Sequence, residues 1–187
     1  MSPRRYGKTS LVLHVLKKQD FPFAHIDFYK ELNINDIEHA ILNGAGRLLG
    51  CIESTPKRLL KLGAEFFSNF HVKVGLGLKD IGLQLEINRA KKQPKDTILT
   101  VLEKLHDLAE KHKKKMVLFL DEFQIISEVT QDYSIEAAIR EAAQKSTYIA
   151  YIFSGSNRHL LEAMFFDKKK PFYNLCDIMT LERISAE

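Results

Sequence analysis

Cysteine is scarce in this chain, which has only Cys51 and Cys176 in 187 residues. Two thiols so far apart in sequence do not make the disulfide framework of a small secreted domain, and they fit a reducing compartment. No stretch approaches the ~20 apolar residues that are needed to span a bilayer. The basic first residues are not followed by the apolar core of a signal peptide. We therefore expect a cytoplasmic protein without membrane segments.

Several signatures of catalysis are missing as well. The seven histidines show neither the H-E-x-x-H pattern nor the Cys/His spacing of a zinc site, and there is no G-x-S-x-G elbow. The formal net charge is only +4. The densest basic runs, 111–115 and 168–170, fit either a solvated surface or contact with phosphate or an acidic partner.

What is present is the composition of one globular domain with alternating strands and helices. Hydrophobic residues make up 45% and charged residues 28% of the chain, which is a globular balance. Periodicity predicts helices at 8–18, 36–49, 96–113, 135–144 and 157–165, another helix from 56 on, and strands at 23–28, 116–120, 148–153 and 178–181. Such alternation is typical of a parallel α/β sheet. Alternating apolar residues over 70–87 predict a β-hairpin outside this sheet, in an insertion at about 68–90.

The start of the chain resembles a phosphate-binding loop. Residues 2–9 match the Walker A pattern G-x-x-x-x-G-K-[ST], except that Ser2 replaces the first glycine. Gly7 lets backbone N–H groups turn toward phosphate, Lys8 supplies charge, and the Thr9 hydroxyl suits Mg²⁺. The alternative is an ordinary turn before a helix. The predicted nucleotide contacts are Pro3, Arg4, Arg5, Tyr6, Gly7, Lys8, Thr9, Ser10 and Ser156.

Two carboxylates follow the most apolar predicted strand. In a parallel sheet, ligands bind beyond the carboxyl ends of the strands, so Asp121 and Glu122 are expected near the phosphate loop. Asp121 is the candidate partner of Mg²⁺, and Glu122 is the candidate that orients or deprotonates the attacking water. The alternative is that both carboxylates merely close the strand and cap the next turn.

Small polar residues follow the next strand, at 154–158. Ser156 or Asn157 could sense the γ-phosphate or position water, and Arg158 could reach phosphate in cis or face a neighbouring subunit. The alternative is that Ser156 or Asn157 caps the helix that follows.

Three motifs in this order resemble those of the archaeal-type ATPase family, in the AAA+/STAND branch of P-loop NTPases. They are residues 3–11, the run Leu120-Asp121-Glu122-Phe123-Gln124, and residues 153–160. The segment 164–181 also looks like that family's region after the sensor strand. The resemblance implies a three-layer α/β P-loop core that binds ATP and Mg²⁺ and hydrolyses ATP. It carries Lys8 and Thr9 over as phosphate and Mg²⁺ ligands, Asp121 as the metal-associated acid, and Glu122 as the catalytic acid.

Two departures from the family leave other functions open. Members have a strand before the phosphate loop and a helical lid or winged helix at the end, so residues 1–187 are expected to form an incomplete domain. The leading interpretation is an ATPase, acting as a switch of the STAND type. One alternative is an inactive or non-hydrolysing module that binds a partner protein or itself. Another is an ATPase associated with DNA, which the sequence pI of about 8.9 permits.

Overall fold

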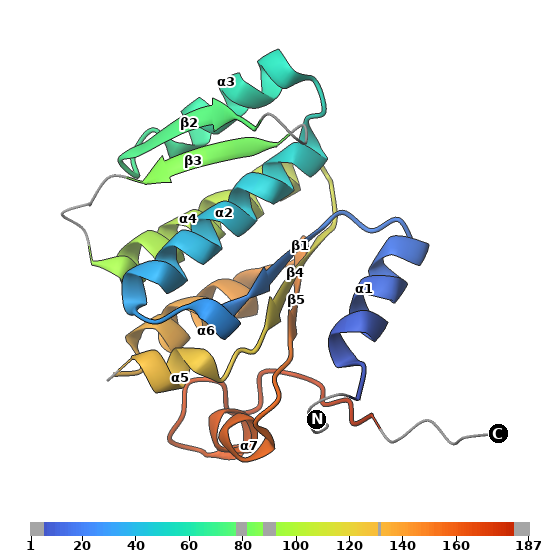
Figure 1. Cartoon of the computed structure of the whole chain (residues 1–187), viewed down its shortest axis with the longest axis vertical. Helices are drawn as coiled ribbons and strands as arrows, with labels where there is room; N and C mark the ends of the chain where they lie inside the picture. The colour runs from blue at the N-terminus through green and yellow to red at the C-terminus, as the bar shows by residue number, and fades with distance from the viewer. Residues whose placement is uncertain (1–5, 78–81, 88–92, 131, 182–187) are drawn as a thin grey trace.

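The computed structural model describes residues 6–77, 82–87, 93–130 and 132–181 (Figure 1). The central sheet contains three described strands, β1 (Phe23–Asp27), β4 (Met116–Asp121) and β5 (Ile149–Phe153). Their order is β1-β4-β5, and both pairs are parallel. β4 is therefore central, and all six of its residues are buried. This is the burial expected for an uninterrupted apolar strand in a parallel sheet.

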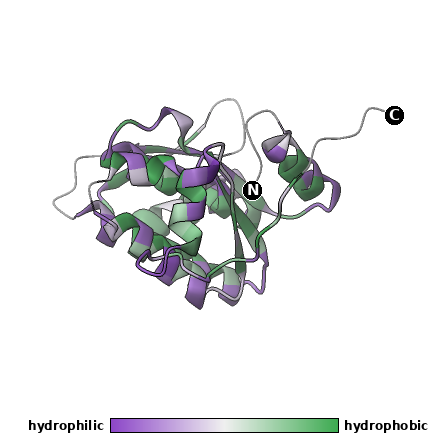
Figure 2. Cartoon of the chain, turned by 90° about the horizontal axis from the view of Figure 1, so that it is seen from below, coloured by the Kyte–Doolittle hydropathy of each residue, from purple (hydrophilic) through white to green (hydrophobic). Residues whose placement is uncertain are grey.

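Helices cover both faces of this sheet, which confirms the predicted three-layer α/β architecture. On one face lie α2 (Ile34–Ile52), α4 (Pro94–Lys111) and α6 (Ser134–Lys145). On the other lies α1 (Lys8–Lys18), as Figure 1 shows. Figure 2 shows hydrophilic residues gathered mainly on the outer faces of the helices. The remaining short elements are η1 (Phe28–Lys30), α5 (Ile125–Val129) and α7 (Arg158–Phe166).

Close contact between α2 and the sheet depends on a glycine. A Cβ atom on Gly44 would lie 2.3 Å from Cδ1 of Ile26 in β1, so the missing side chain allows the helix to approach the strand. Ile26 and Leu118, the two residues nearest to this position, are each 1% exposed. Close packing of this kind fixes the positions of the strand ends.

The predicted hairpin forms its own two-stranded sheet. β2 (Val72–Leu76) and β3 (Leu83–Ile87) pair antiparallel, with Val74 opposite Leu85. The hairpin packs on α3 (Pro56–Phe67), where a Cβ on Gly63 would lie 2.6 Å from Cδ1 of Leu83. The hairpin is therefore separate from the central sheet, as the alternating apolar residues over 70–87 predicted.

The predicted strand at 178–181 is wrong, because these residues have no regular secondary structure. Instead, Ile178 and Leu181 line an apolar groove of about 350 Å³ together with Leu11 of α1 and Phe153 of β5. A short apolar run satisfies either environment, so its composition could not distinguish a strand from a segment that lines a groove. In the described part of the chain, no helix is long and apolar enough to cross a membrane.

Candidate functional site

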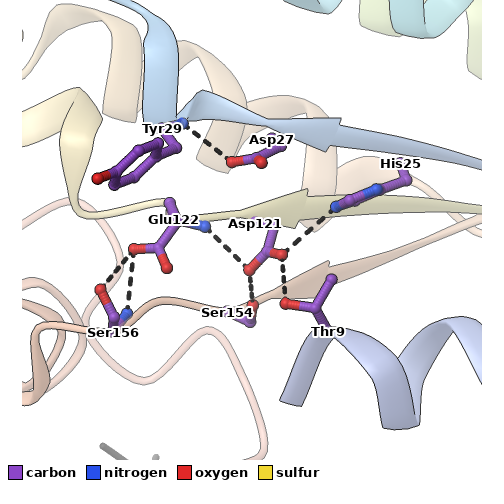
Figure 3. A network of polar contacts seen from close by, with 8 residues as sticks. All are labelled: Thr9, His25, Asp27, Tyr29, Asp121, Glu122, Ser154 and Ser156. Carbon is purple, nitrogen blue, oxygen red and sulfur yellow. Dashed lines mark hydrogen bonds and ion pairs between the residues drawn. The ribbon is translucent and has the colours of Figure 1, made fainter. Parts of the chain in front are cut away.

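The candidate site lies at the carboxyl edge of the central sheet, where three segments distant in sequence meet (Figure 3). Asp121 is the last residue of β4, Ser154 follows β5 directly, and Thr9 lies in the first turn of α1. Parallel pairing places the carboxyl ends of neighbouring strands together. The structure therefore brings the predicted residues Thr9 and Asp121 into contact across 112 positions of sequence.

Strand register explains which side chains share this site. Phe119 pairs with His25 of β1 and with Ile152 of β5. Because side chains alternate between faces, His25, Asp121 and Ser154 all lie on the face covered by α1. The imidazole of His25 stacks on Phe119, with ring centroids 4.8 Å apart. This contact fixes the ring beside the Asp121 carboxylate.

Asp121 is the most heavily hydrogen-bonded group of the site. Its Oδ2 accepts the Thr9 hydroxyl at 2.6 Å and lies 3.4 Å from Nε2 of His25. Its Oδ1 accepts the Ser154 hydroxyl and, at 3.0 Å, the backbone N–H of Glu122. Burial alone would raise the pKa of Asp121, but the hydrogen bonds from His25, Ser154 and Thr9 outweigh it and lower the pKa to about 2. The carboxylate is therefore ionised at neutral pH.

The beginning of α1 supplies the predicted cation. Gly7 adopts the left-handed backbone, with φ 73°, which glycine does at little cost. The peptide then enters α1, and Lys8 lies half-buried at its first position. Partial burial lowers the pKa of Lys8, while Glu122 and Asp121 oppose this shift by their negative charge. Both carboxylates therefore act on Lys8 electrostatically.

Glu122 is held in an uncommon backbone conformation. Its φ is 51°, which costs a non-glycine residue roughly 1 kcal/mol or more. Its Oε2 accepts hydrogen bonds from the Ser156 hydroxyl at 2.7 Å and from Nε2 of Gln124 at 2.6 Å. The backbone N–H of Ser156 also donates to this oxygen at 3.3 Å. These donors fix the carboxylate at the edge of the sheet.

The three candidates after β5 differ in what they contact. Ser156 reaches Glu122, whereas the Asn157 side chain caps α7 by accepting the Leu160 N–H at 3.2 Å. The capping alternative thus applies to Asn157. Arg158 pairs with Glu162 at 2.7 Å, and its side chain is 61% exposed. Within the described residues, these hydrogen bonds of Asn157 and Arg158 lead to α7 and not to the carboxylates of the site.

A glycine lets Gln124 reach Glu122. A Cβ atom on Gly155 would lie 2.0 Å from Oε1 of Gln124. Gln124 is only 3% exposed, and within the described ranges its Oε1 has no hydrogen-bond partner. The buried amide is therefore confined between Gly155 and Glu122, with its Nε2 directed at the carboxylate.

The remaining predicted contacts are less well defined by the structure, and some residues of the site were not predicted. Pro3, Arg4 and Arg5 lie outside the described residues, while Tyr6 is half-buried and Ser10 is exposed in the first turn of α1. Sequence reasoning missed His25, Ser154 and Gln124. The available signals were weak: His25 is a polar residue inside an apolar strand, and Ser154 stands where β5 ends. Both depend on the register between strands.

The three-stranded parallel sheet with helices on both faces gives this chain a fold similar to that of a Walker-type ATPase. In a comparison of structures, the chain is similar to the Walker-type ATPase PABY2304 of Pyrococcus abyssi, with a TM-score of 0.55 and 21% sequence identity. The alignment covers 92% of this chain and 44% of that one, so the chain spans less than half of its length. No family model and no curated protein sequence matches.

Proposed function

We propose that this chain binds ATP together with Mg²⁺ at the carboxyl edge of its central sheet. The observation that carries the proposal is the 2.6 Å contact between the Thr9 hydroxyl and the Asp121 carboxylate. It joins the first turn of α1 to the end of β4, the two places from which a Walker-type site draws its hydroxyl and its acid. The proposed nucleotide site is therefore assembled from the two predicted motifs.

The phosphates would lie against the beginning of α1. Lys8 supplies a full positive charge there, and the N-terminal end of the helix adds its partial charge and free N–H groups. Gly7 has no atom within 4 Å of an added Cβ, so its restriction to glycine comes from its φ of 73°. Among the remaining candidates, Tyr6 and Ser10 flank this turn, and we propose them as peripheral contacts.

The residues present fit Mg²⁺. Thr9 and Asp121 offer oxygen atoms, which this hard cation prefers, and the low pKa of Asp121 keeps its carboxylate charged. The described residues include no cluster of three or more His, Cys, Asp or Glu side chains able to hold a metal alone. We therefore propose that ATP oxygens and water complete the coordination. The bound cation would neutralise charge on the phosphates.

Hydrolysis would use Glu122 as the proton acceptor. A water oxygen would bond to the γ-phosphorus, the bond from that phosphorus to the β–γ bridging oxygen would break, and the water proton would pass to Glu122. ADP and phosphate would leave. Glu122 accepts three hydrogen bonds on one oxygen, so the protein holds this carboxylate in place. A second candidate is a switch that responds to ATP binding alone, which the resemblance to STAND-type ATPases supports.

We also propose the AAA+/STAND branch for this chain. It rests on the order of the three motifs and on the placement of Ser156 beside Glu122. Arg158 is exposed on α7, so a neighbouring copy could receive it at its own phosphate site. Self-association is accordingly part of this proposal.

The test is Mg²⁺–ATP affinity, measured by calorimetry on the chain, on Lys8→Ala and on the matched control Lys18→Ala. Lys18 lies exposed at the other end of α1. We expect micromolar binding that falls at least about tenfold in Lys8→Ala only, because charged hydrogen bonds contribute roughly 1.5–3 kcal/mol. Equal affinities for Lys8→Ala and Lys18→Ala would contradict the proposed site. Glu122→Gln then separates binding from turnover, since it should abolish hydrolysis and preserve affinity.

A further inference from the structure

A basic groove lies away from the candidate ATP site, between α6 and the segment that follows α7. Its volume is about 730 Å³. The charged side chains that line it are Arg140, Glu141, Lys145, Lys168, Lys169 and Lys170. Five cations thus share the groove with one carboxylate. None of Lys8, Thr9, Asp121 and Glu122 lines it.

The single carboxylate is already paired. Lys145 lies 2.6 Å from Glu141 and 3.3 Å from Glu103, so these three residues form an exposed network of their own. In the described ranges, Arg140, Lys168 and Lys169 take part in no ion pair. Arg140, Lys168 and Lys169 therefore have no ion-pair partner in the part of the chain that the structure describes, while Lys170 acts on the buried Glu136 carboxylate only electrostatically.

Arg140 gives the second, independent indication of a ligand. Its Nε is buried and has no hydrogen-bond partner among the described residues. Buried donors of this kind are rare in native structures and need an explanation. Glu136, one turn earlier on α6, is fully buried but does not pair with Arg140. Arg140 also lines the groove, and the planar fork of a guanidinium matches the oxygens of a carboxylate or phosphate there.

The lysines on the opposite wall are held in place. The ammonium of Lys170 lies 3.7 Å from the ring centroid of Tyr133 at the beginning of α6. The preceding turn is closed by Asp167, whose side chain accepts the Lys169 N–H at 2.9 Å and whose carbonyl accepts the Lys170 N–H at 2.9 Å. Three successive lysines are therefore presented beside Arg140 at a lower entropic cost than on a free loop.

We propose that this basic groove binds phosphate groups of a second ligand, independently of the ATP site. A row of lysines beside one guanidinium suits a ligand with several phosphates in sequence. Two sources supply that chemistry, namely a small polyphosphate compound and the backbone of single-stranded nucleic acid. Tyr133 is 48% exposed at the groove, and the ring face that Lys170 does not cover offers a surface on which a base could stack.

The test uses the full chain in a Lys8→Ala background, so that phosphate binding at the ATP site does not contribute. One probe is a fluorescent single-stranded oligonucleotide, followed by anisotropy at several salt concentrations. The other is tripolyphosphate, followed by calorimetry. The groove variant is Lys168→Gln/Lys169→Gln. The matched control is Lys113→Gln/Lys115→Gln, because these two lysines are exposed in the other basic run.

We expect the groove variant to weaken at least one probe about tenfold and the control to change it less than twofold. For the oligonucleotide, the slope of log affinity against log salt should fall by about 1.4, since each phosphate contact on a single strand contributes about 0.7. Loss of tripolyphosphate binding alone assigns the groove to a small phosphorylated ligand, and loss of oligonucleotide binding assigns it to nucleic acid. If neither probe binds, or if both double variants behave alike, the proposal is wrong.

Discussion

Ser156 contacts Glu122 through two donors, its hydroxyl at 2.7 Å and its backbone N–H at 3.3 Å, both to Oε2. The two residues are 34 positions apart in sequence and lie at the ends of neighbouring strands. Glu122 has the left-handed backbone, so the direction of its side chain is not the usual one at a strand end. Ser156 therefore orients the proposed catalytic carboxylate, together with Gln124.

Removing the Ser156 hydroxyl should separate turnover from binding. We expect Ser156→Ala to lower kcat for ATP hydrolysis about tenfold, because Glu122 loses its strongest orienting contact from this residue. The Kd for Mg²⁺–ATP should change less than twofold. Ser156→Thr keeps the hydroxyl and should restore most of the rate. Steady-state kinetics with parallel calorimetry measure both quantities, and an unchanged kcat in Ser156→Ala would refute this role.

The proposed metal site can be tested by removing the hydroxyl group of Thr9. Thr9→Ala removes the donor to Asp121 and the proposed Mg²⁺ ligand together, whereas Thr9→Ser keeps both. We expect ATP affinity in the presence of Mg²⁺ to fall about tenfold in Thr9→Ala and to change little in Thr9→Ser. Without Mg²⁺, the two variants should bind ATP alike. A loss of equal size with and without Mg²⁺ would show that Thr9 acts on phosphate or on folding instead.

Because of Asp121, the free energy of unfolding of the nucleotide-free chain should vary with pH in the acid range. Its pKa falls from 3.8 to about 2 on folding, so the ionised form stabilises the native state. The contribution is about 2–3 kcal/mol, from ~1.4 kcal/mol per pKa unit. It is fully present well above the unfolded value of 3.8 and is lost as the pH falls through about 2.

Urea unfolding at several acid pH values measures this contribution. Asp121→Asn should flatten the decline in the free energy of unfolding over that window. Asp107→Asn, at an exposed position on α4, should retain the decline of the unmodified chain. An equally steep decline in Asp121→Asn would contradict the hydrogen-bonded carboxylate.

Local patterns predicted the elements that carry the site, but not the contacts between them. The helix Lys8–Lys18 was predicted with its observed bounds, because its apolar stripe directly follows the glycine turn. The central strand was predicted because uninterrupted apolar residues suit burial on both faces. His25 and Ser154 were missed because their approach to Asp121 depends on register between strands. That register is determined by packing of the whole sheet, which no local window contains.

Gly155 provides a last prediction, because its lack of a side chain leaves room for Gln124. In Gly155→Ala the new Cβ would meet Oε1 of Gln124 at 2.0 Å and Cδ1 of Leu161 at 2.9 Å. Gln124 is buried and cannot swing into solvent, so we expect destabilisation by about 1–3 kcal/mol, as for other overpacked sites. Displacement of Gln124 should also lower the rate of hydrolysis through Glu122.

Gly75→Ala is the matched control. The nearest atom to an added Cβ there is the Gln84 carbonyl oxygen at 3.9 Å, which is ordinary contact. The free energies of unfolding of the two variants, measured with heat and with urea, should therefore differ clearly. Gly75→Ala should stay within about 0.5 kcal/mol of the unmodified chain, as is usual for substitutions away from packed or strained sites. If Gly155→Ala were equally stable, Gln124 would have room to move. The contact that directs its amide at Glu122 would then not be fixed by packing.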